Sequence, residues 1–275
     1  MNKYVERLKN KEFLIMTHRG SWQGNICQNT RQSTVIAYKY GTDVVEVDVR
    51  KSKDGHYYLF HNGNEPNLLG KNLDFSKISS EDILRDSLIN ATLEPSGYMV
   101  ERLDDYLAWL PEEYLINLDR SYFYFDDPNF FKILEESGKT SQIFLKAPDV
   151  DDYLENINKM DVDIPFVSVI NNPDTYYKIL ENYPNIRIIG AEYIASSKEP
   201  SEKEMEFFSE LKNNNKIVLA NSINLGKDRN LFYGLYDDDA ILNNPDDIWG
   251  KMLDYGVNMI QTDFPYFLNQ FRKNR

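Results

Sequence analysis

Two carboxylates and two histidines in the first quarter of the chain have the spacing of a metal-dependent site. Glu46 and Asp48 lie two residues apart in the apolar segment VVEVDV. Because side chains alternate along a β-strand, the two carboxylates share one face, opposite the neighbouring valines. Two buried carboxylates side by side repel each other unless a cation lies between them. His18 follows the apolar segment FLIMT, and His61 follows YYLF.

Further polar residues stand at the ends of other apolar segments. Asp119 ends YLINLD, and Lys146 ends QIFLK. Together with Glu46 and Asp48, Asp119 supplies only carboxylate oxygens, a set that suits Mg²⁺, Ca²⁺ or Mn²⁺. Arg19, next to His18 in the chain, offers a planar fork for a phosphate oxygen, and Lys146 could add a point charge.

The two histidines titrate near neutral pH, so such a pair can act as general base and general acid across a phosphodiester. His18 as base with His61 as acid is one assignment, and the reverse fits the sequence nearly as well. The third histidine, His56, lies beside an Asp-Gly turn and is predicted to be exposed and without a catalytic role. Asp263, near the end of the chain, is predicted to shape a closing turn rather than to take part in chemistry.

Eight short apolar segments, each a predicted strand, alternate with amphipathic segments. They span residues 13–17, 43–49, 114–118, 142–146, 165–169, 186–191, 216–220 and 258–262. Strands that alternate with helices indicate a parallel sheet, and at 275 residues a closed (β/α)8 TIM barrel is its simplest form. A doubly wound open sheet is the alternative, but no glycine-rich nucleotide-binding motif follows the first strand. Catalytic groups in a barrel project from the C-terminal strand ends.

The segments between the strands include four clear amphipathic helices, predicted over residues 31–41, 129–138, 175–183 and 203–213. The stretch from about 62 to 110 is polar and rich in turns. It is predicted to be an insertion after the second β element that covers the barrel mouth. No linker, low-complexity tract or internal repeat interrupts the chain, so residues 1–275 are predicted to form a single domain.

Composition limits the partners and the compartment. The net charge of −13 argues against nucleic acid, which requires a basic surface, but not against a small anionic substrate. No apolar run is long enough to span a membrane. The single cysteine, Cys27, excludes an internal disulfide, and the N-terminus lacks a signal-like apolar stretch, so a cytoplasmic location is expected. The oligomeric state is not indicated.

The motifs around these residues resemble the glycerophosphodiester phosphodiesterase family, whose members are phospholipase-C-like barrels. The chain has HRG at 18–20, QNT at 28–30, EVD at 46–48, KDG at 53–55 and FHN at 60–62, where the family run is HRG, ENT, ExD, a turn with DG, and HD. GVNMIQTDFP at 256–265 resembles the family's C-terminal motif. The order is the same, and the match covers both ends of the chain.

The resemblance implies a TIM barrel with a small insertion after the second strand. It implies that His18 and His61 are the catalytic histidines, and that Glu46 and Asp48 bind a divalent cation, often Ca²⁺ or Mg²⁺. Asp119 stands where the family usually has a glutamate ligand. The implied reaction of glycerol and lipid metabolism is cleavage of a small glycerophosphodiester to glycerol 3-phosphate and an alcohol.

Besides Asp119, three further motif positions differ from the family pattern. Gln28 replaces the glutamate of ENT, Asn62 replaces the aspartate after the second histidine, and Ser121 stands where a lysine is common. Lys146 or Arg120 is a candidate to replace that lysine. Two alternatives therefore remain: a phosphodiester lyase or transferase that forms a cyclic phosphate, and a non-catalytic barrel that binds a phosphate ligand.

Overall fold

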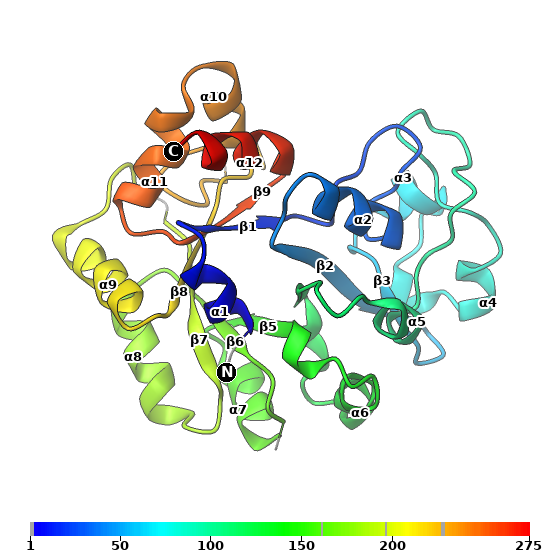
Figure 1. Ribbon diagram of the computed structural model, residues 1–275. Helices are drawn as coiled ribbons and strands as arrows, with labels where there is room; N and C mark the ends of the chain where they lie inside the picture. The colour runs from blue at the N-terminus through cyan, green and yellow to red at the C-terminus, as the bar shows by residue number, and fades with distance from the viewer. Residues whose placement is uncertain (1–2, 161, 196, 227–228) are drawn as a thin grey trace.

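The computed structural model describes residues 3–160, 162–195, 197–226 and 229–275, and it confirms the (β/α)8 TIM barrel (Figure 1). Within these residues, eight parallel strands pair in the order β1-β2-β4-β5-β6-β7-β8-β9, and β9 pairs with β1 to close the barrel. Each coincides with a predicted strand. Their bounds are β1 Leu14–Thr17, β2 Val44–Lys51, β4 Ile116–Asp119, β5 Ile143–Pro148, β6 Phe166–Ile170, β7 Ile188–Tyr193, β8 Ile217–Asn221 and β9 Met259–Thr262.

Helices surround the strands, and the four predicted from the sequence are among them. The outer layer comprises α2 Arg31–Lys39, α5 Leu103–Trp109, α6 Pro128–Glu136, α7 Asp151–Lys159, α8 Pro173–Asn182, α9 Glu202–Asn213, α10 Asp237–Leu242, α11 Lys251–Asp254 and α12 Pro265–Asn274. Other short helical segments are η2 Ser121–Tyr124, η3 Thr140–Gln142 and η4 Asp246–Gly250. Helix α1, Lys3–Lys9, lies across one end of the barrel (Figure 1), where its Tyr4 is fully buried.

The alternation of side chains along the strands builds two cores. The residues that face outward pack under the helices, as Val45, Val47 and Val49 do. Those that face inward form a separate apolar cluster with Tyr4, among them Leu14, Val44, Leu115, Phe144 and Met259. Two or four positions further along the strands, the same alternation places polar residues inside the barrel: His18, Glu46, Asp48, Asn117, Asp119, Lys146, Asn221 and Gln261.

The segment after β2 forms a lobe at one side of the barrel (Figure 1). It begins with β3, Tyr57–Leu59, which pairs antiparallel with β2, and continues through α3 Glu65–Leu69, η1 Phe75–Lys77 and α4 Ser80–Ile83. These elements share a small core of their own that includes Tyr58, Phe60 and Phe75. Helix α5 instead packs into the main core. The insertion boundaries of about 62–110 and the single domain remain predictions.

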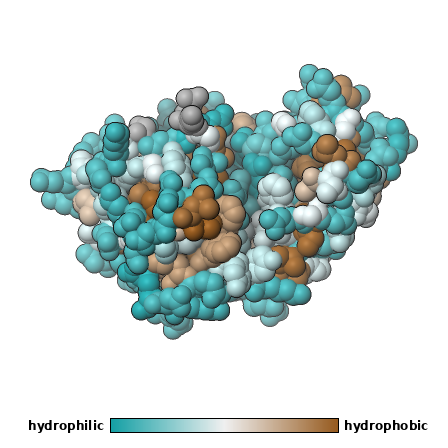
Figure 2. Space-filling model, turned by 90° about the horizontal axis from the view of Figure 1, so that it is seen from above, coloured by the Kyte–Doolittle hydropathy of each residue, from teal (hydrophilic) through white to brown (hydrophobic). Residues whose placement is uncertain are grey.

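Hydrophilic residues cover most of the face shown in Figure 2, and hydrophobic residues gather there in a few separate patches. The acidic residues outnumber the basic ones by 44 to 31, which agrees with this polar surface. Among the described residues, no helix has both the length and the apolar character needed to cross a membrane.

Asp43, between α2 and β2, joins both ends of the chain to the barrel. Its buried carboxylate accepts hydrogen bonds from Lys11, from Arg272 of α12 and from the Ile15 backbone N–H of β1. We expect Asp43→Ala to reduce the free energy of unfolding by about 3–5 kcal/mol, because it leaves the mostly buried Arg272 guanidinium without its carboxylate.

Urea unfolding followed by circular dichroism measures this loss of stability. Glu155→Ala is the matched control, because Glu155 and Lys159 form an exposed pair on α7 that contributes less than about 1 kcal/mol. Equal stability of the two variants would show that the Asp43 ion pairs do not hold the ends of the chain.

Candidate active site

Three carboxylates meet at the C-terminal ends of β2 and β4. Asp48 and Asp119 occupy paired positions on these neighbouring strands, and Glu46 lies on the same face of β2 as Asp48. One ligand atom from each carboxylate lies within 4.8 Å of the others. The cluster that the sequence predicted could therefore hold a metal ion.

The environment of Glu46 fits a bound cation. The backbone N–H of Arg19 donates a hydrogen bond of 2.8 Å to Glu46 Oε2, while Oε1 is buried and has no hydrogen-bond partner among the described residues. Burial and the neighbouring Asp48 carboxylate raise the pKa of Glu46 to about 8. A divalent cation would supply the missing partner for Oε1 and would favour the ionised carboxylate.

Asp48 lies among positive and polar groups. Arg19 Nε is 3.0 Å from Asp48 Oδ2, Arg120 Nε is 3.4 Å from Asp48 Oδ1, and the Asn29 amide donates to Oδ2 at 3.1 Å. Burial alone would raise the pKa of Asp48, but Arg19 and the other charges near it hold the pKa below its ordinary value. Asp48 is therefore ionised at neutral pH.

Lys146 lies inside the barrel, on the strand next to Asp119. Its Nζ is 2.8 Å from Glu192 Oε2 and 3.6 Å from Asp119 Oδ2, and the Asn221 amide donates to Glu192 Oε1 at 2.5 Å. Burial opposes the charge on Lys146, but Asp119 and Glu192 outweigh it and raise its pKa. Lys146 thus brings a fixed positive charge next to a predicted metal ligand. Its contact with phosphate, like that of Arg19, remains a prediction.

Both motif histidines interact with the carboxylate cluster. His18, after β1, interacts with Glu46 and Asp48, and His61, after β3, interacts with Asp48. Burial and the positive charges of Arg19 and Arg120 lower the pKa of His61 to about 4, although Asp48 opposes this shift. His61 Nδ1 is buried and has no hydrogen-bond partner among the described residues.

His18 has a carboxylate partner that the sequence did not reveal. Its Nδ1 lies 2.9 Å from Asp263 Oδ1, at the end of β9. Burial alone would lower the pKa of His18, but the hydrogen bond to Asp263 and the charge of Glu46 raise it. Asp263 therefore orients a predicted catalytic histidine in addition to shaping a turn. One signal was present: Met259, Gln261 and Asp263 alternate on one face of the last strand.

The departures from the family motifs alter charge more than architecture. Gln28 accepts a hydrogen bond of 2.9 Å from the Arg19 guanidinium, so a neutral amide stands where the motif has a carboxylate. Ser121 is buried and donates to the Leu118 carbonyl oxygen at 2.7 Å. Arg120, in a left-handed backbone conformation with φ 55°, turns toward Asp48. Both Arg120 and Lys146 thus lie beside the carboxylate cluster.

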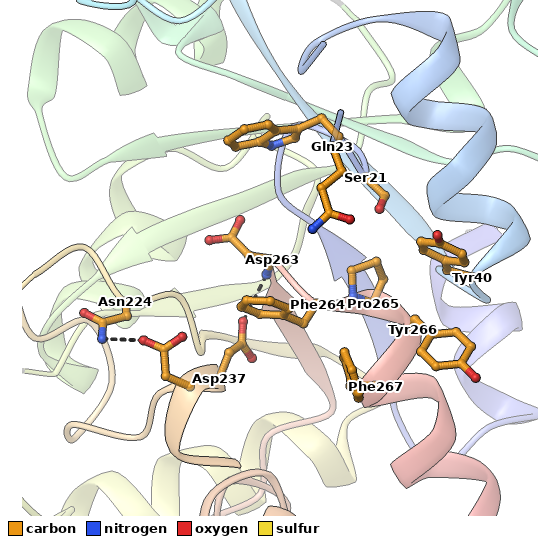
Figure 3. A pocket seen from close by; sticks show the side chains of 12 residues that line it. Ser21, Gln23, Tyr40, Asn224, Asp237, Asp263, Phe264, Pro265, Tyr266 and Phe267 are labelled. Atoms are coloured by element: carbon orange, nitrogen blue, oxygen red, sulfur yellow. Dashed lines mark hydrogen bonds between the residues drawn. The ribbon is translucent and has the colours of Figure 1, made fainter. Parts of the chain in front are cut away.

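A pocket of about 580 Å³ borders the site next to His18. It does not contain the carboxylate cluster, but Asp263 belongs to its lining and also pairs with His18. Figure 3 shows that its wall comes from four places: the loop after β1, the C-terminal end of α2 with Tyr40, the segment after β8, and the junction of β9 with α12. The pocket is large enough for a small organic group beside the histidine.

Comparison with solved structures gives the same fold. Similar structures include a glycerophosphoryl diester phosphodiesterase from Parabacteroides distasonis, with 15% identity, a TM-score of 0.75, and coverage of 98% of this chain and 92% of that one. A glycerophosphodiester phosphodiesterase from Thermotoga maritima has 15% identity, a TM-score of 0.65, and coverage of 94% and 98%. The fold expected from the motif resemblance is thus confirmed.

A third similar structure contains a ligand. It is an Oleispira antarctica phosphodiesterase in complex with the product sn-glycerol-3-phosphate, with 16% identity, a TM-score of 0.64, and coverage of 95% of this chain and 97% of that one. Residues 164–271 match the family DUF4996, described as a domain of unknown function. No curated protein matches the chain.

Proposed function

We propose that the protein hydrolyses a glycerophosphodiester to glycerol 3-phosphate and an alcohol, and that it uses Ca²⁺ or Mg²⁺. The observation that carries the proposal is the grouping of Glu46, Asp48 and Asp119 in one cluster with which both His18 and His61 interact. Similar folds that are named for this activity, and a phosphodiesterase in complex with the product sn-glycerol-3-phosphate, add support.

In this proposal the chain's own residues bind the phosphodiester and move the protons. Glu46, Asp48 and Asp119 hold the cation, which when bound offsets negative charge on the phosphoryl oxygens. The guanidinium groups of Arg19 and Arg120, which face Asp48, are positioned to contact a phosphate that enters above the cluster. Lys146 keeps its charge beside Asp119 and stabilises the same anion at longer range.

We assign the leaving alcohol to His18 and the attacking water to His61. The pocket beside His18 gives space for an alcohol, and the Asp263 carboxylate favours the protonated imidazole that a general acid requires. His61, with its pKa lowered to about 4, is neutral at physiological pH and can accept a proton. This is the second of the two assignments that the sequence allowed.

Incubation with a panel of glycerophosphodiesters tests the proposed function. We expect glycerol 3-phosphate and a free alcohol to appear in the presence of Ca²⁺ or Mg²⁺, and no product after chelation. Phosphorus NMR in heavy-oxygen water identifies the route, since water attack puts the label into the first product. An unlabelled cyclic phosphate would favour the lyase alternative, and inactivity on every diester would contradict an enzyme.

A cytoplasmic role in glycerol and lipid metabolism is part of the same proposal. Cys27 is buried and is the single cysteine of the chain, a composition that suits a reducing compartment. The substrate is a small molecule rather than nucleic acid, in keeping with the net charge of −13.

A further inference from the structure

We propose that Asp237 is a positioning residue for His18, because it fixes the end of β9 from which Asp263 reaches the imidazole. This inference rests on the proposed hydrolase activity and adds a residue that supports the general acid of that reaction. Asp237 is only 1% exposed, and it stands outside the motifs that the chain shares with the phosphodiesterase family.

Both carboxylate oxygens of Asp237 accept hydrogen bonds from other elements. The Trp249 indole N–H donates to Oδ1 at 3.0 Å, while the Thr262 hydroxyl and the Asp263 backbone N–H donate to Oδ2 at 2.8 and 3.0 Å. Figure 3 shows the last of these bonds as a dashed line between Asp263 and Asp237. Although Asp237 is the first residue of α10, each of these donors lies outside that helix. The carboxylate therefore ties β9 and η4 to the start of α10.

Thr262 extends this hold to the next residue of the chain. Its buried hydroxyl donates to Asp237 and accepts a hydrogen bond of 2.9 Å from the Phe264 backbone N–H. A hydroxyl has a single proton, so donation to a fixed carboxylate leaves its lone pairs for Phe264. Asp237 thus holds three consecutive residues at the junction of β9 with α12.

Two of these residues contact His18 directly. The His18 backbone N–H donates to the Thr262 carbonyl oxygen at 3.1 Å, and His18 Nδ1 lies 2.9 Å from Asp263 Oδ1. The Asp263 side chain is 36% exposed, so packing alone does not fix its orientation. The position of its carboxylate depends on the backbone of β9, which Asp237 holds from the buried side.

The network requires a carboxylate at position 237. Burial raises the pKa of Asp237 to about 7, although its hydrogen bonds, that from the Asp263 N–H first among them, oppose this shift. A carboxylate can accept from Trp249 on one side and from β9 on the other. An asparagine has an acceptor on one side only and turns N–H groups toward the other, so one of the two links is lost.

Turnover with two kinds of leaving group tests this role. At about pH 8, where Asp237 is ionised, we expect Asp237→Asn to lower kcat about ten-fold on a glycerophosphodiester with an alkyl leaving group. KM should change little, because the contacts to phosphate remain. A nitrophenyl diester needs no proton for its leaving group, so on it the variant should keep most of its rate. Asp239→Asn is the matched control, since it removes the same charge from an exposed position of α10 and should alter neither rate.

A double-mutant cycle shows whether Asp237 acts through Asp263. In Asp263→Asn, the additional change Asp237→Asn should cause no further loss, since the carboxylate that it positions is already gone. Thr262→Val breaks the same link with a smaller change, and it replaces Asp237→Asn in the cycle if that variant does not fold. Equal losses with and without the Asp263 carboxylate, or equal losses on alkyl and nitrophenyl diesters, would overturn the role of Asp237.

NMR of the metal-free protein separates this inference from the proposed activity. With histidine labelled by nitrogen-15, the proton between His18 Nδ1 and Asp263 should give a downfield signal in the unmodified protein and in Asp239→Asn. In Asp237→Asn and in Thr262→Val it should broaden or disappear. That result without turnover of any diester would contradict the hydrolase and support the positioning role. An unchanged signal in both of these variants would overturn the positioning role.

Discussion

Replacement of either His18 or His61 by alanine is expected to lower turnover of a glycerophosphodiester by about two to four orders of magnitude. Each imidazole moves one proton in the proposed reaction, and no other described histidine lies in the site. Steady-state rates at saturating metal measure the loss. His56→Ala is the matched control, because His56 is exposed and its ring contacts Arg102.

The leaving group distinguishes the two roles. A nitrophenol leaves without a proton, so the variant that lacks the general acid should recover most of its rate on a nitrophenyl diester, whereas the variant that lacks the base should not. We expect the recovery in His18→Ala. Recovery in His61→Ala would reverse the assignment, and near-normal turnover of both variants on alkyl diesters would remove the histidines from the mechanism.

Asp263 acts in this scheme as a positioning residue through His18. An asparagine at this position would keep the shape but no longer stabilise the imidazolium, and it would disturb the tautomer. The catalytic pKa of the histidine should therefore fall in Asp263→Asn. A pH–rate profile detects that shift, which a purely structural role of Asp263 would not produce.

The part of the site on β2 and β4 could be predicted because strict alternation governs those strands. Val44, Glu46 and Asp48 face the interior, the valines between them face the helices, and Asp119 pairs with Asp48 across the sheet. The period of two and the position at a strand end were enough to place three carboxylates together. The barrel followed from the same segments, since each predicted strand is present.

Glu192 could not be placed by the same reasoning. The pairing of β6 with β7 shifts by one residue between Phe166 and Val167, so alternation counted from Ile189 would put Glu192 outside the barrel. The irregularity turns Glu192 inward, where it binds Lys146. Gly190 allows this irregular pairing because it has no side chain: a Cβ at this position would lie only 2.1 Å from the Ile217 carbonyl oxygen. A local register shift has no signal in residue types alone.

The contacts of Asp48 and His18 were also beyond the sequence, for a different reason. Arg120 reaches Asp48 because its backbone adopts a left-handed conformation, and Asp263 reaches His18 because closure of the barrel brings β9 beside β1. Both pairs join side chains whose contact depends on backbone conformation or strand closure rather than on residue type. The sequence identified which groups could react, while the closed sheet determines which of them are partners.

Glu46→Gln is expected to abolish most activity and most of the stabilisation that Ca²⁺ or Mg²⁺ gives to the unmodified protein. The amide keeps an oxygen for the Arg19 N–H, so the fold should remain, but the cluster loses a charged ligand. At a metal concentration about 100-fold above Kd, binding should stabilise the unmodified protein by about 2.7 kcal/mol, and the variant by far less. Thermal unfolding with metal and with a chelator measures the difference.

Without metal, the unmodified protein should lose stability relative to Glu46→Gln as pH rises. The pKa of Glu46 is about 8 in the folded state and lower when unfolded. The unfolded chain therefore releases this proton first, and the metal-free protein loses stability from about pH 4.5 to about pH 8. Glu46→Gln has no such proton, so near about pH 8 it should be the more stable of the two without metal. Equal metal stabilisation of both proteins would show that the ion does not bind at Glu46.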